Sequence, residues 1–191
     1  MFRIQKRVLE IAKSLQEIEP TRKHKFLEVG ANDGVSQSNS LQLEELGWDG
    51  ILIEPSLIPF KALDVRRNCS HKFNCAIGDG SIDFISGTFN TGSLMSSCDP
   101  EIVGKKTLIK SILKNILFKV FPWNEKFKPS MTKVQVRTLS NLIEVSKIDL
   151  IDIMILDIEG YEISAIKGLD SKYDPRIMVI ETRKRDAFEI N

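Results

Sequence analysis

Cysteine, histidine and long hydrophobic runs are all scarce in this sequence. The three cysteines, Cys69, Cys75 and Cys98, are irregularly spaced, and only two histidines accompany them in 191 residues. This supply is too small for a disulfide framework or a Cys/His zinc site, so we expect reduced thiols and a cytoplasmic location. No stretch approaches the roughly 20 consecutive apolar residues that cross a bilayer. Glu10 and Glu17 interrupt the first part of the chain, where a signal sequence would need an apolar core.

Neither sign of charge is in excess. Lys plus Arg total 27 against 26 for Asp plus Glu, which gives a net charge of +1. A protein with this balance has no general attraction for a polyanion, so we expect no nucleic-acid partner. With 42% hydrophobic and 28% charged residues, the chain has enough apolar surface to form a core. Its length predicts a single domain over residues 1–191.

The spacing of apolar residues predicts alternating strands and helices. An amphipathic helix opens the chain within residues 1–20, because apolar residues recur at helical spacing from Ile4 to Ile18 and Pro20 ends the pattern. The predicted strands after it are 26–29, 50–54, 73–77, 134–137, 151–156 and 177–180, and the predicted helices are 41–46, 57–66, 139–145 and 163–169. Strands that alternate with helices indicate an α/β fold with a mostly parallel sheet.

A basic segment interrupts this alternation at about residues 87–131. Between Lys105 and Lys133 there are eight lysines and one acid, Glu125, while apolar residues repeat at helical spacing from Leu108 to Phe121. The pattern predicts a basic amphipathic helix. Its apolar face could pack on the sheet, lie on an anionic membrane surface as a peripheral contact, or cover a substrate cleft.

Acidic and glycine residues follow the predicted strands. In an open parallel sheet, ligands bind beyond the carboxyl ends of the strands, so these residues are candidates for binding and chemistry. The first strand leads into the segment Glu28-Val29-Gly30-Ala31-Asn32-Asp33-Gly34, the second ends at Glu54 and the third is followed by Asp79. Glu54 comes 20 residues after Gly34, where an acid can accept both hydrogen bonds from a ribose diol. The pattern therefore indicates a nucleoside-containing ligand.

The glycine-rich segment favours one class of cofactor. A dinucleotide needs a G-x-G-x-x-G turn for its pyrophosphate, and this segment lacks the middle glycine. Glu28 and Asp33 would repel a pyrophosphate but attract a cationic sulfonium. The sequence therefore favours S-adenosyl-L-methionine over NAD. The structural alternative is a tight strand-to-helix turn in which Asn32 and Asp33 act as caps.

Four segments together resemble a known family. Residues 27–34, 53–55, 134–139 and 157–162 are similar, in order and spacing, to the signatures of FkbM-type S-adenosylmethionine-dependent methyltransferases, and the last reads Asp157-Ile158-Glu159-Gly160-Tyr161-Glu162. The resemblance implies a class I methyltransferase (Rossmann-like) fold, with helices on both faces of the sheet. It also implies methylation of a hydroxyl on a sugar or another small-molecule acceptor.

The resemblance assigns roles to individual residues. It puts Glu28, Gly30, Asn32 and Gly34 around the methionine part of the cofactor, with Asp33 in the same turn. Glu54 would hold the ribose, and Asp79 would lie near the adenine. The three acids of the later motif, Asp157, Glu159 and Glu162, would carry the catalytic chemistry.

Two mechanisms remain open for these three acids. Asp157 or Glu159 could remove the proton of the acceptor hydroxyl. Alternatively, two carboxylates could hold Mg²⁺, which would lower the pKa of that hydroxyl. The structural alternative is that Glu159 and Gly160 form a helix entry, where the N-terminal dipole stabilises acids. No residue is assigned as a metal ligand.

The end of the sequence departs from the usual class I pattern. Residues 183–191 are too short for the C-terminal β-hairpin, so we expect this sheet edge to be lacking or supplied by a second copy in a homo-oligomer. The leading hypothesis is therefore an O-methyltransferase. The alternative is a catalytically silent, truncated methyltransferase-like domain that serves as a binding or assembly module. An NAD-dependent oxidoreductase is disfavoured by the glycine-rich segment.

Overall fold

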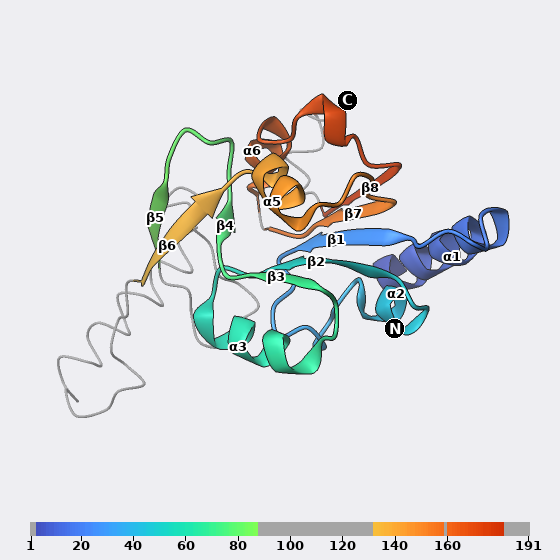
Figure 1. Ribbon diagram of the computed structural model, residues 1–191. Helices are drawn as coiled ribbons and strands as arrows, with labels where there is room; N and C mark the ends of the chain where they lie inside the picture. Colours follow the sequence, from blue (N-terminus) through green and yellow to red (C-terminus); the bar gives the residue numbers. More distant parts are fainter. Residues whose placement is uncertain (1–2, 88–131, 159, 182–191) are drawn as a thin grey trace.

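A five-stranded parallel sheet forms the centre of the computed structural model, which describes residues 3–87, 132–158 and 160–181 (Figure 1). Its strands are β1 (Lys25–Val29), β2 (Asp49–Ile53), β3 (His71–Phe73), β7 (Ile153–Leu156) and β8 (Ile177–Ile180). Their spatial order is β3-β2-β1-β7-β8, and each neighbouring pair is parallel. The chain moves outward from β1 to β3 and then restarts on the other side of β1. The junction of β1 and β7 is therefore a topological switch point, where such sheets bind ligands.

Helices cover both faces of this sheet (Figure 1). Side chains of alternate residues along a strand point to opposite faces. Phe26, Leu52 and Ile153 share one core cluster with apolar residues of α1, α2 and α3, whereas Leu27, Ile51 and Met154 share the other with residues of α5 and α6. The helices are α1 (Arg3–Ile18), α2 (Leu41–Glu45), α3 (Leu57–Arg66), α5 (Leu139–Ser146) and α6 (Glu162–Lys167), and a short 3-10 helix, η2, spans Ser171–Tyr173.

These layers confirm the predicted fold class, an α/β fold with a mostly parallel sheet. The first helix, α3 and α5 begin and end within about two residues of the predicted bounds. The periodicity succeeded for the first helix and α5 because each buries one apolar stripe, such as Val8, Ala12 and Leu15 of α1.

The predicted third strand, 73–77, is wrong as a continuous element. β3 ends at Phe73, and the side chain of Asn74 donates hydrogen bonds to the carbonyl oxygens of Glu54 and Pro55 at 2.8 and 3.0 Å. This turn takes the chain out of the main sheet. Residues Ala76–Ile77 then form β4 in a separate three-stranded sheet.

The second sheet has the order β4-β6-β5. β6 (Thr132–Arg137) contains the predicted strand 134–137, but it pairs in parallel with β4 and antiparallel with β5 (Phe84–Gly87) rather than joining the main sheet. β5 was not predicted, because Phe84 is about half exposed and the run lacks a clear alternation. The second sheet continues from the carboxyl end of β3 and lies beside that edge of the main sheet (Figure 1).

Several predicted features lie outside the described residues. These are the basic helix at 108–121 within the segment 88–131, the acid Glu159, Cys98 and the chain end from 182. Among the helices that the structure does describe, none has the length and apolar character needed to cross a membrane.

Candidate functional site at the carboxyl edge of the sheet

The segments that follow β1 and β7 lie in direct contact at the switch point. The backbone N–H of Asp157 donates to the carbonyl of Val29 at 3.1 Å, and that of Gly30 donates to Ile53 at 2.9 Å. Gly30 has a φ of +87°, and a Cβ atom at this position would overlap the carbonyl oxygen of Asp157. Only glycine meets both requirements, so this residue allows the two strand ends to approach each other.

Glu54 connects the end of β2 to the glycine-rich segment. The side chain is 7% exposed, and its two carboxylate oxygens accept hydrogen bonds from the backbone N–H groups of Asn32 (2.9 Å) and Ser56 (2.7 Å). Burial raises the pKa of Glu54, although the hydrogen bonds from Ser56 and Asn32 act against this shift. Asn32 itself has a left-handed φ of +50°. The structure thus brings together two of the predicted cofactor-binding residues.

Glu28 is buried beneath the segment that leads into α2. Its Oε1 accepts a hydrogen bond from the backbone N–H of Asn39 at 2.9 Å, and its Oε2 accepts hydrogen bonds from the hydroxyls of Ser40 (2.5 Å) and Ser38 (3.3 Å). Burial raises the pKa of Glu28, opposed by these hydrogen bonds and by the nearby charge of Arg67. The carboxylate therefore binds residues 38–40 of the same chain and does not face solvent.

Asp33 caps the turn that follows it. Its Oδ1 accepts hydrogen bonds from the backbone N–H groups of Val35 and Ser36, and its Oδ2 lies 2.6 Å from Nη1 of Arg66. Partial burial tends to raise the pKa of Asp33, but the hydrogen bonds from Ser36, Val35 and Arg66 lower it overall. Glu28 and Asp33 each have an arginine nearby, which removes the electrostatic argument that they would repel a pyrophosphate.

The acidic turn after β7 is closed by one of its own acids. Glu162 is 3% exposed, and its Oε1 accepts hydrogen bonds from the backbone N–H groups of Gly160 (3.0 Å) and Ile158 (3.4 Å). Asp157 is half-buried at the end of β7, where its Oδ2 lies 3.4 Å from the side-chain amide nitrogen of Asn39. Of the predicted catalytic acids that the structure describes, Asp157 contacts the glycine-rich segment through its backbone, and Glu162 stabilises the turn.

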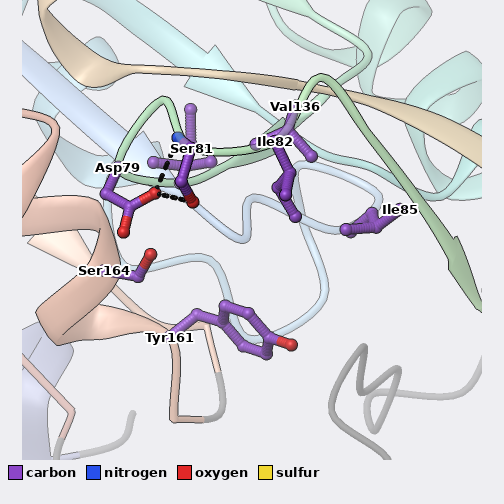
Figure 2. A pocket seen from close by; sticks show the side chains of 9 residues that line it. Asp79, Ser81, Ile82, Ile85, Val136, Tyr161 and Ser164 are labelled. Atoms are coloured by element: carbon purple, nitrogen blue, oxygen red, sulfur yellow. Dashed lines mark hydrogen bonds between the residues drawn. The ribbon is translucent and has the colours of Figure 1, made fainter.

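Asp79 lies apart from these groups, on the second sheet. It follows β4 and lines a small pocket between that sheet and α6 (Figure 2). Hydrogen bonds from the hydroxyl and backbone N–H of Ser81, at 2.5 and 2.9 Å, lower the pKa of Asp79. The pocket is lined by Ile77, Gly78, Asp79, Ser81, Ile82, Ile85, Val136, Tyr161 and Ser164. Its aliphatic wall comes from the second sheet, and Tyr161 and Ser164 face that wall from the side of α6 (Figure 2).

The sequence interpretation missed part of the site. Tyr161 lies inside the motif 157–162, so its position in the sequence could have marked it as a candidate site residue. The pocket residues Ile82, Ile85 and Ser164 lie outside the four motif segments, so no sequence signal pointed to them. Arg67 and its serine partners were also missed, because a helix-ending arginine normally faces solvent.

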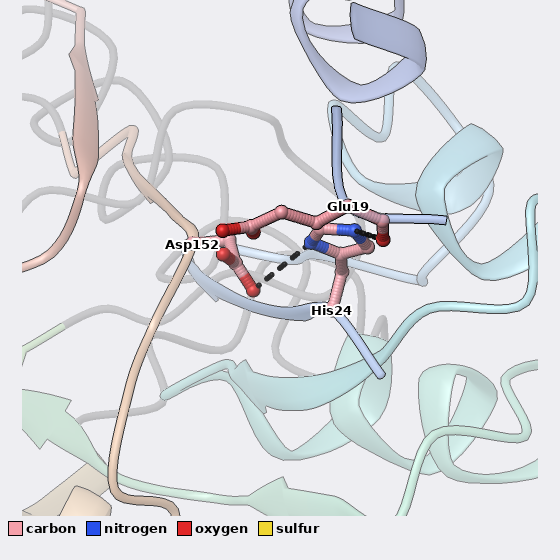
Figure 3. A group of neighbouring side chains, drawn as sticks. All are labelled: Glu19, His24 and Asp152. Carbon is pink, nitrogen blue, oxygen red and sulfur yellow. Dashed lines mark hydrogen bonds and ion pairs between the residues drawn. The ribbon is translucent and has the colours of Figure 1, made fainter. Parts of the chain in front are cut away.

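A second polar cluster lies at the opposite, amino edge of the sheet. Glu19, His24 and Asp152 bring side-chain ligand atoms within 4.8 Å of one another (Figure 3). However, Arg22 lies 3.1 Å from Asp152 Oδ1, and Arg176 lies 3.1 Å from that oxygen and 2.6 Å from Glu19 Oε2. Two guanidinium groups therefore balance the two acids, and a divalent cation there would face repulsion. We interpret the cluster as a structural connection between the end of α1 and the starts of β1 and β7.

The comparisons with known proteins gave one finding. Residues 28–191 match the sequence profile of the methyltransferase FkbM domain, a range that includes every residue discussed at the carboxyl edge. No curated protein and no solved structure matches the chain.

The contact at Gly30 predicts a difference between two glycines. Gly30→Ala should lower the free energy of unfolding by about 3 kcal/mol, because a left-handed alanine is strained and its Cβ overlaps Asp157. Gly47 is the matched control, since it has a φ of +86° and a Cβ atom added there would have no neighbour within 4 Å. Gly47→Ala should cost only about 1 kcal/mol. Equal losses in urea denaturation would contradict the assignment.

The amino-edge cluster predicts a stability effect without a metal. Asp152 is fully buried, and Asp152→Ala would leave two arginines and the backbone N–H of Lys25 without this partner. We expect a loss of about 3 kcal/mol by urea denaturation. Glu10→Ala, which removes an exposed pair with Lys6, should change stability by less than about 0.5 kcal/mol. A rise in the melting temperature of the unmodified protein on adding Zn²⁺ would instead support a metal site.

Proposed function

The chain belongs to the FkbM methyltransferase family, and from this premise we propose that it transfers a methyl group from S-adenosylmethionine to a hydroxyl of a sugar or another small hydroxylated acceptor. The observation that supports the cofactor assignment most directly is the buried Glu54 carboxyl, hydrogen-bonded to Asn32 of the glycine-rich segment at the switch point.

The donor set around Glu54 fits a ribose. Its hydrogen bonds come from Asn32 and Ser56 rather than from a lysine or arginine. A carboxylate can accept about four hydrogen bonds, and Glu54 accepts three, from the backbone N–H groups of Asn32 and Ser56 and from the side chain of Ser56, so it keeps capacity for one ribose hydroxyl. A buried carboxyl whose partners are uncharged is stabilised in its ionised form by an additional donor, and a ribose hydroxyl supplies one.

The pocket beside Asp79 fits the adenine. A purine has two apolar faces and an exocyclic amino group that donates hydrogen bonds. Ile77, Ile82 and Val136 offer aliphatic contacts for such faces, and only Oδ1 of Asp79 accepts from Ser81. Its Oδ2 could accept from the amino group. This supports the role that the sequence motif implied for Asp79.

Bound S-adenosylmethionine supplies an electrophilic methyl group on a sulfonium. The chain must then orient the acceptor hydroxyl and take its proton. We assign this role to a carboxylate oxygen of Asp157, because the backbone of Asp157 contacts the glycine-rich segment directly after β7, whereas the carboxylate of Glu162 is engaged in its own turn. Proton transfer to Asp157 requires no metal ion, and the buried Glu162 takes no part in it because its carboxylate is hydrogen-bonded to the backbone of the turn.

Cofactor binding can be measured by isothermal titration with S-adenosylhomocysteine. Glu54→Gln should weaken binding by at least about tenfold, because an amide NH2 replaces one carboxylate oxygen and can accept neither the ribose hydroxyl nor the backbone N–H of Asn32 or Ser56. Glu45→Gln is the matched control, since Glu45 is exposed on α2. Because the pKa of Glu54 is raised, we expect affinity to fall with decreasing pH already above the ordinary glutamate range near 4.5. A folded protein that does not bind would refute the cofactor assignment.

Catalysis can be separated from binding at Asp157. Asp157→Asn should reduce methyl transfer by about 100-fold or more, because it removes the proton acceptor, while the dissociation constant of S-adenosylhomocysteine changes by less than about threefold. The assay follows radiolabelled methyl transfer from S-adenosylmethionine to a panel of simple glycosides, with and without Mg²⁺. Tight cofactor binding by the unmodified protein without any turnover would favour the silent binding module.

A further inference from the structure

Arg67 is a fully buried arginine to which the proposed reaction gives no role. It follows α3, and 1% of its surface is exposed. Its guanidinium donates hydrogen bonds to Glu44 Oε2 at 2.7 Å, the carbonyl oxygen of Gly34 at 3.0 Å, and the hydroxyls of Ser38 and Ser40 at 3.1 Å each. A buried cation is tolerated only when such acceptors surround it. Three of the four acceptors belong to one short segment, 34–40.

Two of these acceptors connect Arg67 to Glu28. The hydroxyl of Ser40 accepts from Arg67 and donates to Glu28 Oε2 at 2.5 Å, and the hydroxyl of Ser38 does the same at 3.3 Å. A hydroxyl has one proton to donate, so the cation on one side and the carboxylate on the other fix its direction. The two serines thus form a bridge between opposite charges inside the protein.

The bridge continues to the end of β7. Glu28 Oε1 accepts the backbone N–H of Asn39 at 2.9 Å, and the side-chain amide of Asn39 donates to Asp157 Oδ2 at 3.4 Å. Arg67 also holds the carbonyl of Gly34, the last residue of the glycine-rich segment. A Cβ at Gly34 would lie 2.6 Å from Cγ of Arg67, so the segment and the arginine are tightly packed.

We propose that Arg67 is a positioning residue, which acts through Ser38, Ser40 and Glu28 to hold the segment 34–40 and the amide of Asn39 against Asp157. The catalytic consequence rests on the proposed function, because it concerns the cofactor-binding turn and Asp157. The positioning of segment 34–40 by Arg67 does not rest on the proposed function, because it involves only residues of this chain.

Arg67→Lys tests the proposal, because lysine keeps the charge but loses the planar fork that reaches several acceptors at once. In the folded variant without cofactor, hydrogen–deuterium exchange of the amides in segment 34–40 should be at least about tenfold faster. The dissociation constant of S-adenosylhomocysteine should rise by at least about tenfold. Arg176→Met is the matched control. It removes an arginine from two acids at the opposite edge, so it should lower the melting temperature without changing either measurement.

Asn39→Ala isolates the last step. It keeps the backbone N–H that Glu28 accepts and removes only the side-chain contact with Asp157. We expect kcat to fall by about tenfold while the KM for S-adenosylmethionine changes by less than about twofold. If Asn39 only stabilised the fold, Asn39→Ala would lower the melting temperature and leave both kcat and the KM for S-adenosylmethionine unchanged.

The outcomes separate this inference from the proposed function. If the unmodified protein fails to bind S-adenosylhomocysteine, the proposed function fails, and the exchange experiment still decides whether Arg67 holds the segment. Unchanged exchange and unchanged affinity in folded Arg67→Lys would overturn the inference. If that variant does not fold, Ser40→Ala replaces it, since it removes one bridging hydroxyl and leaves the charges in place. For Ser40→Ala we would again measure hydrogen–deuterium exchange of segment 34–40 and the dissociation constant of S-adenosylhomocysteine.

Discussion

The backbone contact between the ends of β1 and β7 is the constraint on which the rest of the site depends. The two strands are sequence-distant, yet the N–H of Asp157 bonds to Val29 and the Asp157 carbonyl lies where a side chain of residue 30 would be. Because the strand ends are this close, the segment after β1 must turn sharply toward β2. That turn places the N–H of Asn32 on the Glu54 carboxylate. The ends of β1, β2 and β7 are thereby connected through backbone groups and the side chain of Glu54, with glycine required where β1 meets β7.

Charge compensation keeps this turn in place without bringing a strong field into the site. Glu28 and Asp33 lie on the same segment as the turn, but Arg67 and Arg66 offset them from the end of α3. Among the described residues, the hydrogen bonds to Glu54 come from uncharged donors. The site therefore contains two acids that have an arginine nearby, Glu28 and Asp33, and one buried acid, Glu54, whose hydrogen-bond donors among the described residues are uncharged. The number of acids at the ends of β1 and β2 is therefore a poor guide to the net charge at this edge of the sheet, because arginines offset two of them.

The sequence was sufficient for the features that depend on local pattern. The bounds of α1 and α5 follow from apolar stripes. The sequence was not sufficient where contacts with residues distant along the chain decide where a strand ends or whether a side chain is buried. The break after Phe73 depends on Asn74 bonding back to the β2 end, and β4 is only two residues long. The burial of Arg67 depends on acceptors more than twenty positions away, which periodicity does not reveal.

The break after Phe73 also changes what the carboxyl edge can bind. A continuous strand over 73–77 would have kept Ile77 and Asp79 in line with the main sheet. Instead β4 pairs with β6, and the close packing of Gly168 against the carbonyl of Gly78 brings the second sheet onto the end of α6. An aliphatic wall thus faces Tyr161 and Ser164, only a few residues beyond Asp157 in the chain (Figure 2). The same departure that made the strand hard to predict therefore creates the apolar surface beside the acidic turn, which is the surface that the proposed function gives to the adenine.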